Sequence, residues 1–226
     1  MKKYHLLILV TAVLFNCRTE KKEKEAIKQK QTSVLEKIAK AHGYDNWDKV
    51  ESIAFTFNVD RDSTHFERSW MWKPKTDEVT HINSSDTLTY NRRNMDSVAY
   101  KTNAGFINDR YWLLAPFNLI WDQDNFTYEL TEGSVAPISE EPMQKLTIVY
   151  SSEGGYTPGD AYDFYFDSDH LIKEWVFRKG NQQEPSITTT WENYATIAGF
   201  NFVKDHKKTG EYFNLYIDII SVALQE

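Results

Sequence analysis

The sequence of 226 residues contains a single cysteine, Cys17, which lies close to its N-terminus. A disulfide framework needs at least two cysteines, so none can form within the chain. Structural zinc sites built from several cysteines are excluded for the same reason. The fold must therefore rest on its hydrophobic core, for which the sequence offers 41% hydrophobic and 15% aromatic residues.

The chain also lacks the short motifs that mark common catalytic sites. It has no H-E-x-x-H zinc motif, no G-x-S-x-G nucleophile elbow, no G-x-G-x-x-G loop and no Walker-type loop. The five histidines after Cys17 show no metal-binding spacing: His42, His65, His81, His170 and His206. We therefore predict no catalytic residue, no metal and no cofactor, and we expect that the protein is not an enzyme.

Two groups of acidic residues leave other functions open. Asp163, Asp167 and Asp169 lie around a hairpin signal and could hold a calcium ion, although the spacing and distal Glu of an EF-hand are missing. Acidic turns are common on protein surfaces, so a solvated turn is the preferred interpretation. The pairs Glu140–Glu141 and Asp122–Asp124 have the residue types of a glycosidase, but the sequence does not give the distance between their carboxylates.

Positive charge is outweighed by negative charge over the whole chain. The sequence has 26 Lys and Arg against 33 Asp and Glu, and its formal net charge is -7. An acidic surface repels nucleic acid and anionic membrane surfaces. We therefore expect no nucleic-acid partner.

No hydrophobic run reaches the roughly 20 residues that a transmembrane helix needs. The run Leu6–Phe15 follows two lysines and is typical of the hydrophobic region of a signal peptide. Leu14-Phe15-Asn16-Cys17 is similar to a bacterial lipobox, whose cysteine is lipidated and becomes the first residue after cleavage, although Asn16 replaces the usual small residue. Residues 1–16 are therefore predicted to be a lipoprotein signal peptide. The alternative is a soluble exported protein with an incidental cysteine in its leader.

The next segment is too polar to build a core. Residues 18–31 read RTEKKEKEAIKQKQ and are almost all charged or polar. Such a composition does not order itself. We predict that residues 17–31 form a lipid-anchored tether, and that residues 32–226 form a single domain, which we expect to be a monomer joined to the membrane only through the N-terminal lipid.

Apolar periodicity predicts one N-terminal helix followed by strands. Residues 32–42 place apolar side chains at helical spacing, and Gly43 follows where a helix would end. Alternating apolar residues then predict strands, with a hairpin around the turn at residues 167–169. These predicted strands lie within residues 51–59, 65–73, 144–151, 162–180, 186–194, 199–207 and 211–225. The segments 186–194 and 199–207 are predicted to form a further pair.

Strands and helices do not alternate along the chain, so a parallel α/β sheet is excluded. The pattern predicts an α+β fold that is mainly an antiparallel β-sheet curved around a core. Residues 111–114 are predicted to form a short lid helix that ends before Pro116 and continues as a loop closing one side of the sheet.

Four segments together resemble the LolA/LolB-like lipoprotein-localisation superfamily, in its branch of uncharacterised bacterial lipoproteins. They are AHGYDNWDKVESIAFTF (41–57), YWLLAPFNLIWD (111–122), YDFYFDSDHLIKEWVF (162–177) and TTTWENYATIAGFNF (188–202). Their order is informative, while no single motif is diagnostic. The resemblance implies an incomplete β-barrel of about ten antiparallel strands, lidded by helices, with an apolar cavity for acyl chains. It also implies a Gram-negative outer membrane.

The aromatic residues supply the candidate binding site. Large rings most often fill a core, but ligand pockets are also mainly apolar with a few polar groups. The candidate cavity residues are Phe55, Phe57, Phe66, Arg68, Trp70, Trp72, Tyr111 and Trp112. Because Arg68 shares the face of its aromatic neighbours, it would meet a lipid headgroup if that face points inward. A bulge that turns Arg68 outward, or an internal Asp or Glu partner, is the alternative.

These observations predict a non-catalytic envelope lipoprotein that binds an acyl chain or lipid in its concave sheet. It would be anchored by Cys17 to the outer membrane, on a face that the sequence leaves open. A cell-envelope module for a glycan or a protein partner is the alternative. Aromatic residues inside a cavity would favour lipid, an exposed row would favour glycan, and a filled interior would favour a structural or protein-docking role.

Overall fold

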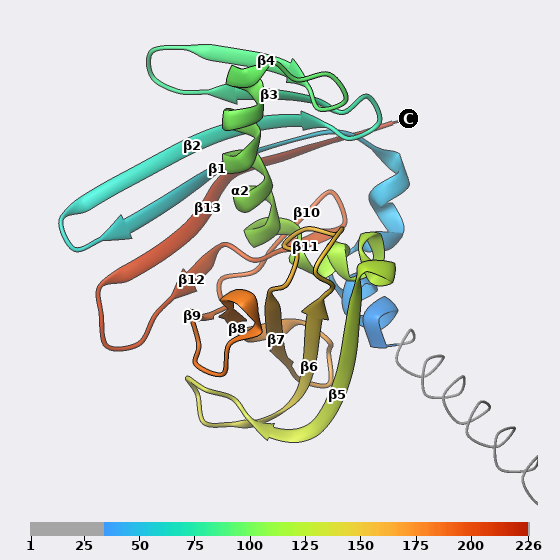
Figure 1. Cartoon of the computed structure of the whole chain (residues 1–226), viewed down its shortest axis with the longest axis vertical. Coiled ribbons are helices and arrows are strands. Elements are labelled where there is room, and N and C mark those ends of the chain that lie inside the picture. Colours follow the sequence, from blue (N-terminus) through green and yellow to red (C-terminus); the bar gives the residue numbers. More distant parts are fainter. Residues whose placement is uncertain (1–33, 226) are drawn as a thin grey trace, which may run out of the picture.

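The computed structural model describes residues 34–225. The predicted signal peptide, Cys17 and the predicted tether lie outside the described residues. Within them the chain forms two large antiparallel sheets, a separate two-stranded hairpin, a short N-terminal helix at residues 34–41, one long helix and several short 3-10 segments (Figure 1).

The larger sheet has six strands in the order β12-β13-β1-β2-β3-β4. Its central strands β1 and β13 are long, and they pair antiparallel although more than 150 positions separate partners such as Asn58 and Tyr216. The strands are β1 (Val50–Arg61), β2 (Thr64–Lys73), β3 (Glu78–Ile82), β4 (Thr87–Asn91), β12 (Asp205–Lys207) and β13 (Phe213–Leu224).

The smaller sheet has five strands in sequence order, β5 to β9, and β10 and β11 form a separate hairpin. Neither sheet closes on itself, so the whole is an incomplete, curved barrel. The described residues form thirteen strands, of which ten have four or more residues, and the resemblance implied about ten. The remaining strands are β5 (Phe126–Val135), β6 (Pro142–Tyr150), β7 (Ala161–Phe166), β8 (Ile172–Arg178), β9 (Ile187–Thr190), β10 (Ala195–Ile197) and β11 (Phe200–Phe202).

One predicted strand pair was wrong. Segments 186–194 and 199–207 do not pair as a hairpin, because β9 pairs with β8 and the only ladder contact between the two segments is the isolated bridge between Glu192 and Asp205. Ala198 and Gly199 both have positive φ, which closes β10 on β11 as a tight two-residue turn. The period-two pattern located strands within the predicted segments but missed β3, β4 and β5, and it could not show which neighbour each strand would pair with.

The predicted short helix at residues 111–114 is part of α2 (Ser97–Trp121), which has 25 residues and contains Pro116. Asp96 caps its start by accepting a hydrogen bond from the Ala99 backbone N–H at 2.8 Å. Pro116 was expected to end the helix, but the helix bends instead: Leu114 has non-helical angles of φ -121° and ψ 20°.

The N-terminal helical segment, residues 34–41, is held against the β10–β11 hairpin. Leu35 and Ile38 are fully buried in the core. Gly43 ends the segment with φ 95°, and a Cβ there would lie 2.4 Å from the Gly199 oxygen. Only glycine allows both that angle and that close approach.

Candidate functional site

The inner face of the β1–β2 hairpin is aromatic. The register pairs Phe55 with Trp70 and Phe57 with Arg68, without a bulge between these strands. Phe55, Phe57, Trp70 and Trp72 are all at least 96% buried. Partners in a pair share one face of a sheet, so these side chains project together toward α2.

Arg68 points inward with its aromatic neighbours and meets an internal partner. Its Nε donates to Asp109 Oδ2 at 2.8 Å and its Nη2 donates to Asp109 Oδ1 at 2.6 Å. The guanidinium also lies over the rings of Phe57 and Phe66, 5.6 and 4.9 Å from their centroids. The two alternatives for Arg68 are thus resolved in favour of an inward side chain with an internal carboxylate.

Asp109 is fully buried in the middle of α2 and collects four hydrogen bonds. Besides the two from Arg68, Trp70 Nε1 donates at 2.8 Å and Asn108 Nδ2 donates at 3.0 Å. Burial raises the pKa of Asp109, and the charge of Arg68 together with these hydrogen bonds opposes that rise. The charged carboxylate therefore depends on Arg68, and it joins α2 to β2.

A glycine in α2 makes room for this ion pair. A Cβ on Gly105 would lie 2.7 Å from Arg68 Nη1. Glycine costs about 1 kcal/mol relative to alanine inside a helix, so its presence here is locally unfavourable. The close approach of the guanidinium explains the residue.

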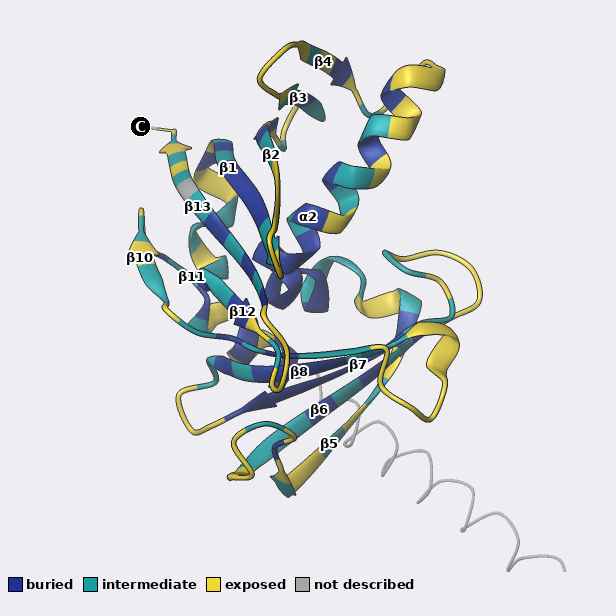
Figure 2. Ribbon diagram, turned by 90° about the vertical axis from the view of Figure 1, so that its left-hand side faces the viewer, coloured by how far each residue is buried: buried dark blue, intermediate teal, exposed yellow. Residues whose placement is uncertain are grey.

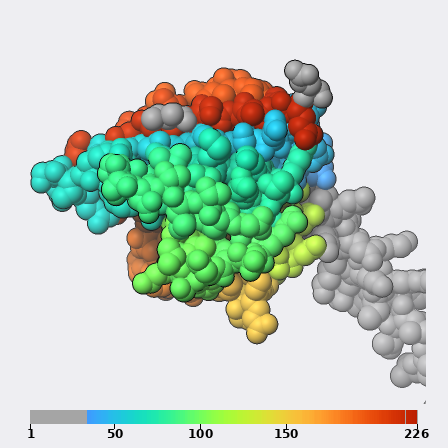
Figure 3. Space-filling model, turned by 90° about the horizontal axis from the view of Figure 1, so that it is seen from above, coloured from blue at the N-terminus to red at the C-terminus, as the bar shows by residue number. Residues whose placement is uncertain are grey.

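Helix α2 covers the aromatic face of the six-stranded sheet (Figures 1 and 2). The Phe106 ring lies 5.5 Å from Trp70 and 5.6 Å from Trp72, and it is fully buried between them. The other side of the helix start reaches solvent: Val98 is 58% and Tyr100 is 70% exposed. Seen from above, β3, β4 and this end of α2 form one continuous face (Figure 3).

The bend in α2 divides the helix into two parts. The part before Leu114 lies over the large sheet, while the part after it is almost entirely buried, with Ala115, Phe117 and Leu119 at 1% exposure or less. Pro116 has no N–H to donate to the Trp112 oxygen four positions earlier. His206 lies against Trp112, with ring centroids 5.0 Å apart, and burial lowers its pKa to about 3.

The remaining predicted cavity residues fall into different places. Phe66 lies at the rim of the inner face and is 48% exposed. Tyr111 and Trp112 are buried on the side of α2 that faces the smaller sheet. The ring centroids of Trp112 and Trp175 are 4.4 Å apart, and the Tyr111 ring stacks on that of Tyr156 with centroids 3.9 Å apart. The structure therefore brings five of the six candidate residues of the β1–β2 hairpin together on the buried face and leaves Phe66 at its rim beside Arg68. Tyr111 and Trp112 are separated from them.

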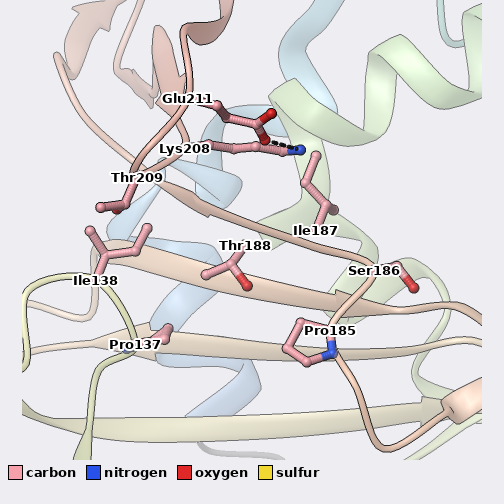
Figure 4. A pocket seen from close by; sticks show the side chains of 9 residues that line it. All are labelled: Pro137, Ile138, Pro185, Ser186, Ile187, Thr188, Lys208, Thr209 and Glu211. Carbon is pink, nitrogen blue, oxygen red and sulfur yellow. Dashed lines mark ion pairs between the residues drawn. The ribbon is translucent and has the colours of Figure 1, made fainter.

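An open pocket of about 330 Å³ lies elsewhere, between the start of β9, the loop after β5 and the loop before β13 (Figure 4). Lys208 and Glu211 at its edge form an ion pair of 2.7 Å. None of the predicted cavity residues lines it. Its lining comprises Pro137, Ile138, Pro185, Ser186, Ile187, Thr188, Lys208, Thr209 and Glu211.

The acidic residues around the β7–β8 turn are matched with basic ones. Lys173 lies 3.5 Å from Asp167 and 3.3 Å from Asp169, and Asp163 pairs with Arg178. Across residues 34–225 no cluster of three or more His, Cys, Asp or Glu has a metal-binding arrangement. No helix in the same range is both long and apolar enough to cross a membrane.

Sequence reasoning missed the helix residues that complete the site, Phe106, Asp109 and Arg110. A helical signal was present: Ala99, Asn103, Phe106 and Asp109 are all buried and recur at spacings of four, three and three. The polar members of that series hid it, because a period defined by apolar residues skips Asn103 and Asp109.

Comparisons of sequence and of structure give different results. No protein-family model matches the sequence, and no curated protein matches it. A LolA superfamily protein from Nitrosomonas europaea has a similar structure, with a TM-score of 0.50, 12% identity, and coverage of 86% of this chain and 94% of that one. The chain thus has a LolA-like fold, and at this identity the likeness concerns the fold alone.

Two further structures align at lower scores. A DUF1329 family protein from Desulfovibrio piger has a TM-score of 0.48 and 11% identity, with coverage of 84% of this chain and 92% of that one. A putative outer membrane lipoprotein-sorting protein domain from Vibrio parahaemolyticus has a TM-score of 0.44 and 10% identity, with coverage of 83% and 91%.

Proposed function

We propose that this protein is a non-catalytic envelope lipoprotein that binds an acyl chain or lipid on the aromatic face beneath α2. One observation carries the proposal. The inner face of the β1–β2 hairpin is covered by a bent helix whose middle is attached through a charged pair, Arg68–Asp109, rather than through apolar contacts alone. Apolar residues at these two positions would stabilise the contact between α2 and β2 at least as well as the ion pair does. We therefore take the ion pair as a sign that the helix also detaches from the sheet.

The bend supplies the place where such a cover can move. Leu114 departs from helical angles and Pro116 removes a backbone hydrogen bond, while the segment after the bend stays anchored in the core. The segment before it rests on Phe106 and Asp109. If this segment swings away, Trp70, Trp72 and Phe55 become accessible to a ligand.

The energy of binding is sufficient for an acyl chain. Each buried CH₂ group contributes ~0.8 kcal/mol, so ten of them contribute roughly 8 kcal/mol before the costs of association and of moving α2. Micromolar affinity corresponds to about 8 kcal/mol, so a chain somewhat longer than ten carbons is the expected ligand class.

A glycan-binding role is less well supported. Stacking on sugars needs exposed aromatic rings, and all seven tryptophans are buried or half-buried at residues 47, 70, 72, 112, 121, 175 and 191. A protein-docking module remains the alternative if no apolar ligand is found, because the aromatic face is filled by Phe106 in this structure.

Native mass spectrometry of protein purified without detergent, followed by lipid extraction, tests the proposal. We expect bound fatty acid or phospholipid, and we expect Trp70→Ala to reduce its amount. Trp191→Ala is the matched control, because Trp191 is equally buried at 2% exposure but belongs to the cluster on the smaller sheet. Equal loss in both variants, or no lipid in the wild type, would leave the protein-docking role.

The membrane anchor is a separate part of the proposal. Cys17 is expected to carry the lipid and to begin the mature chain, because it follows a short apolar run and precedes a charged segment. Cys17→Ser should leave an unprocessed precursor that incorporates no labelled palmitate. Normal processing and labelling of that variant would refute the anchor.

A further inference from the structure

Arg110 lies on α2, and its charged side chain forms no ion pair with any residue that the structure describes. It follows Asp109 in α2, but among residues 34–225 the ion pairs formed by arginine involve Arg68, Arg92, Arg93 and Arg178. Its Nε is fully buried and makes no hydrogen bond. The residue as a whole is half-buried, and its terminal nitrogens are not among the fully buried atoms that lack a partner.

Aromatic rings hold this guanidinium in place. Its carbon lies 5.2 Å from the ring centroid of Trp72, 5.4 Å from that of Trp121 and 6.0 Å from that of Phe106. These distances are those of cation–π contacts, which stabilise the charge but accept none of its N–H groups. The N–H groups along the edge of the planar guanidinium are therefore left without an acceptor.

A second buried donor without an acceptor lies at the same place. Trp72 is 96% buried and its Nε1 makes no hydrogen bond. Buried donors in folded proteins nearly always have a partner, and two without one, on side chains in mutual contact, are a rare combination. An anionic group with several oxygens, bound beside both side chains, would offer each donor an acceptor.

The charges around Arg110 limit what that group can be. Burial lowers the pKa of Arg110 to about 10, with a further lowering from Arg92, so the side chain is still a cation at neutral pH. Asp122 is the nearby carboxylate, but it forms no ion pair with Arg110 and accepts a hydrogen bond from the Tyr150 hydroxyl at 3.2 Å. A ligand anion has to compete with Asp122 for the same charge.

We infer that Arg110 and Trp72 form a recognition site for the anionic headgroup, a phosphate or carboxylate, of an amphiphile. The tail of the same molecule lies along Trp72, Phe106 and Trp121, whose faces flank the guanidinium. This inference rests on the proposed function and adds the chemical class of its ligand. It assigns headgroup recognition to Arg110 in place of Arg68, whose Nε and Nη2 already donate to the buried Asp109 carboxylate.

Three probes on the full chain, freed of bound amphiphile, test the inference by titration calorimetry and tryptophan emission. They are dodecyl phosphate, dodecanol and inorganic phosphate. We expect dodecyl phosphate to bind about tenfold or more tightly than dodecanol, because hydrogen bonds to charged groups exceed neutral ones by that order. Weak binding of inorganic phosphate would identify the amphiphile as the ligand, while equal binding of inorganic and dodecyl phosphate would overturn the amphiphile and leave a free-anion site.

Variants separate this site from the apolar one. Arg110→Met should abolish the preference for dodecyl phosphate and leave dodecanol binding unchanged, and Asp122→Asn should increase the preference by removing the competing carboxylate. Trp72→Phe, which keeps a ring but removes the indole N–H donor, should reduce the preference for dodecyl phosphate. This variant tests the site if Arg110→Met does not fold. Arg93→Met is the matched control, since Arg93 is an exposed arginine paired with Asp77.

The outcomes distinguish failure of the inference from failure of the proposed function. Equal affinity of the wild type for dodecyl phosphate and dodecanol would overturn the headgroup site and leave the apolar ligand standing. Binding of neither probe would overturn both. An unchanged preference in Arg110→Met would show that the anion binds at another place.

Discussion

Arg68 on β2 and Asp109 on α2 form a two-point contact, with Nη2–Oδ1 and Nε–Oδ2 distances of 2.6 and 2.8 Å. The two partners differ in burial: the Arg68 side chain is 28% exposed, whereas Asp109 has no exposure. Replacing Asp109 therefore leaves the charge of Arg68, which water can reach. Replacing Arg68 leaves the charge of Asp109, which water cannot reach.

We predict an asymmetric loss of stability from this difference. Arg68→Met strands the buried Asp109 and should lower the free energy of unfolding by about 3–5 kcal/mol. Asp109→Asn leaves Arg68 partly solvated over Phe57 and Phe66 and should cost about 1–3 kcal/mol. Urea unfolding followed by circular dichroism measures both values.

The double variant Arg68→Met/Asp109→Asn completes this test. Because it removes both charges, we expect it to be more stable than Arg68→Met alone. Losses that simply add would mean that the two side chains act independently, contrary to the contact described here.

The second prediction concerns Gly105 and its closeness to Arg68. In the Arg68→Met background, Gly105→Ala should stabilise the protein by about 1 kcal/mol through helix propensity. In the wild type the added Cβ meets Arg68 Nη1, so the same substitution should be neutral or destabilising. Unfolding free energies of the four proteins give the coupling, and an equal gain in both backgrounds would disprove the role of Gly105 as space for the guanidinium.

The third prediction concerns acid stability. Burial lowers the pKa of His42 to about 4 and that of His206 to about 3, below the usual value of 6.5. Below the usual value the unfolded chain takes up protons that the folded one does not, so stability falls as the pH falls from about 6.5 toward those lower values. Each histidine should remove about 2 kcal/mol of unfolding free energy between about pH 7.5 and about pH 5.

Substitution isolates the contribution of one ring. His42→Gln should reduce this acid loss, as measured by urea titration at the two pH values. His65→Gln is the control, because Asp60 and Glu67 raise the pKa of that exposed imidazole and no acid loss comes from it. If both variants lose stability with pH as steeply as the wild type, the buried histidine does not govern the effect.

The fourth prediction compares two glycines with positive φ. Gly43 has φ 95° and its Cβ would clash with the Gly199 backbone, whereas Gly210 has φ 81° and open space around it. Gly210→Ala should therefore cost about 1 kcal/mol of conformational strain, and Gly43→Ala distinctly more. Thermal unfolding of the two variants measures the difference, and equal losses would mean that the close approach at Gly43 is relieved cheaply.

The sequence predicted the strands better than their partners. Alternation along residues 51–59 and 65–73 placed Phe55, Phe57, Arg68 and Trp70 on one face, and the register confirms this. Alternation is a local property of a strand, whereas pairing depends on distant segments, which is why β9 was assigned to the wrong neighbour.

The site was predictable only on its sheet side. The partner of Arg68 lies 41 positions later in a helix that the polar residues Asn103 and Asp109 concealed, and Pro116 suggested an end where the helix only bends. Among the described residues, Arg68 forms an ion pair and Arg110 does not. This difference depends on how β2 and α2 pack against each other, which no sequence pattern within either segment shows.

Photo-crosslinking with a diazirine-bearing palmitate tests the central claim most directly. The purified protein is irradiated with the probe, and the labelled peptides are mapped by mass spectrometry. The account predicts labels on β1, β2 and the part of α2 before Leu114, with competition by unlabelled palmitate and less labelling in Trp70→Ala. Labels confined to exposed residues such as Tyr100 and Tyr212, without competition, would contradict it.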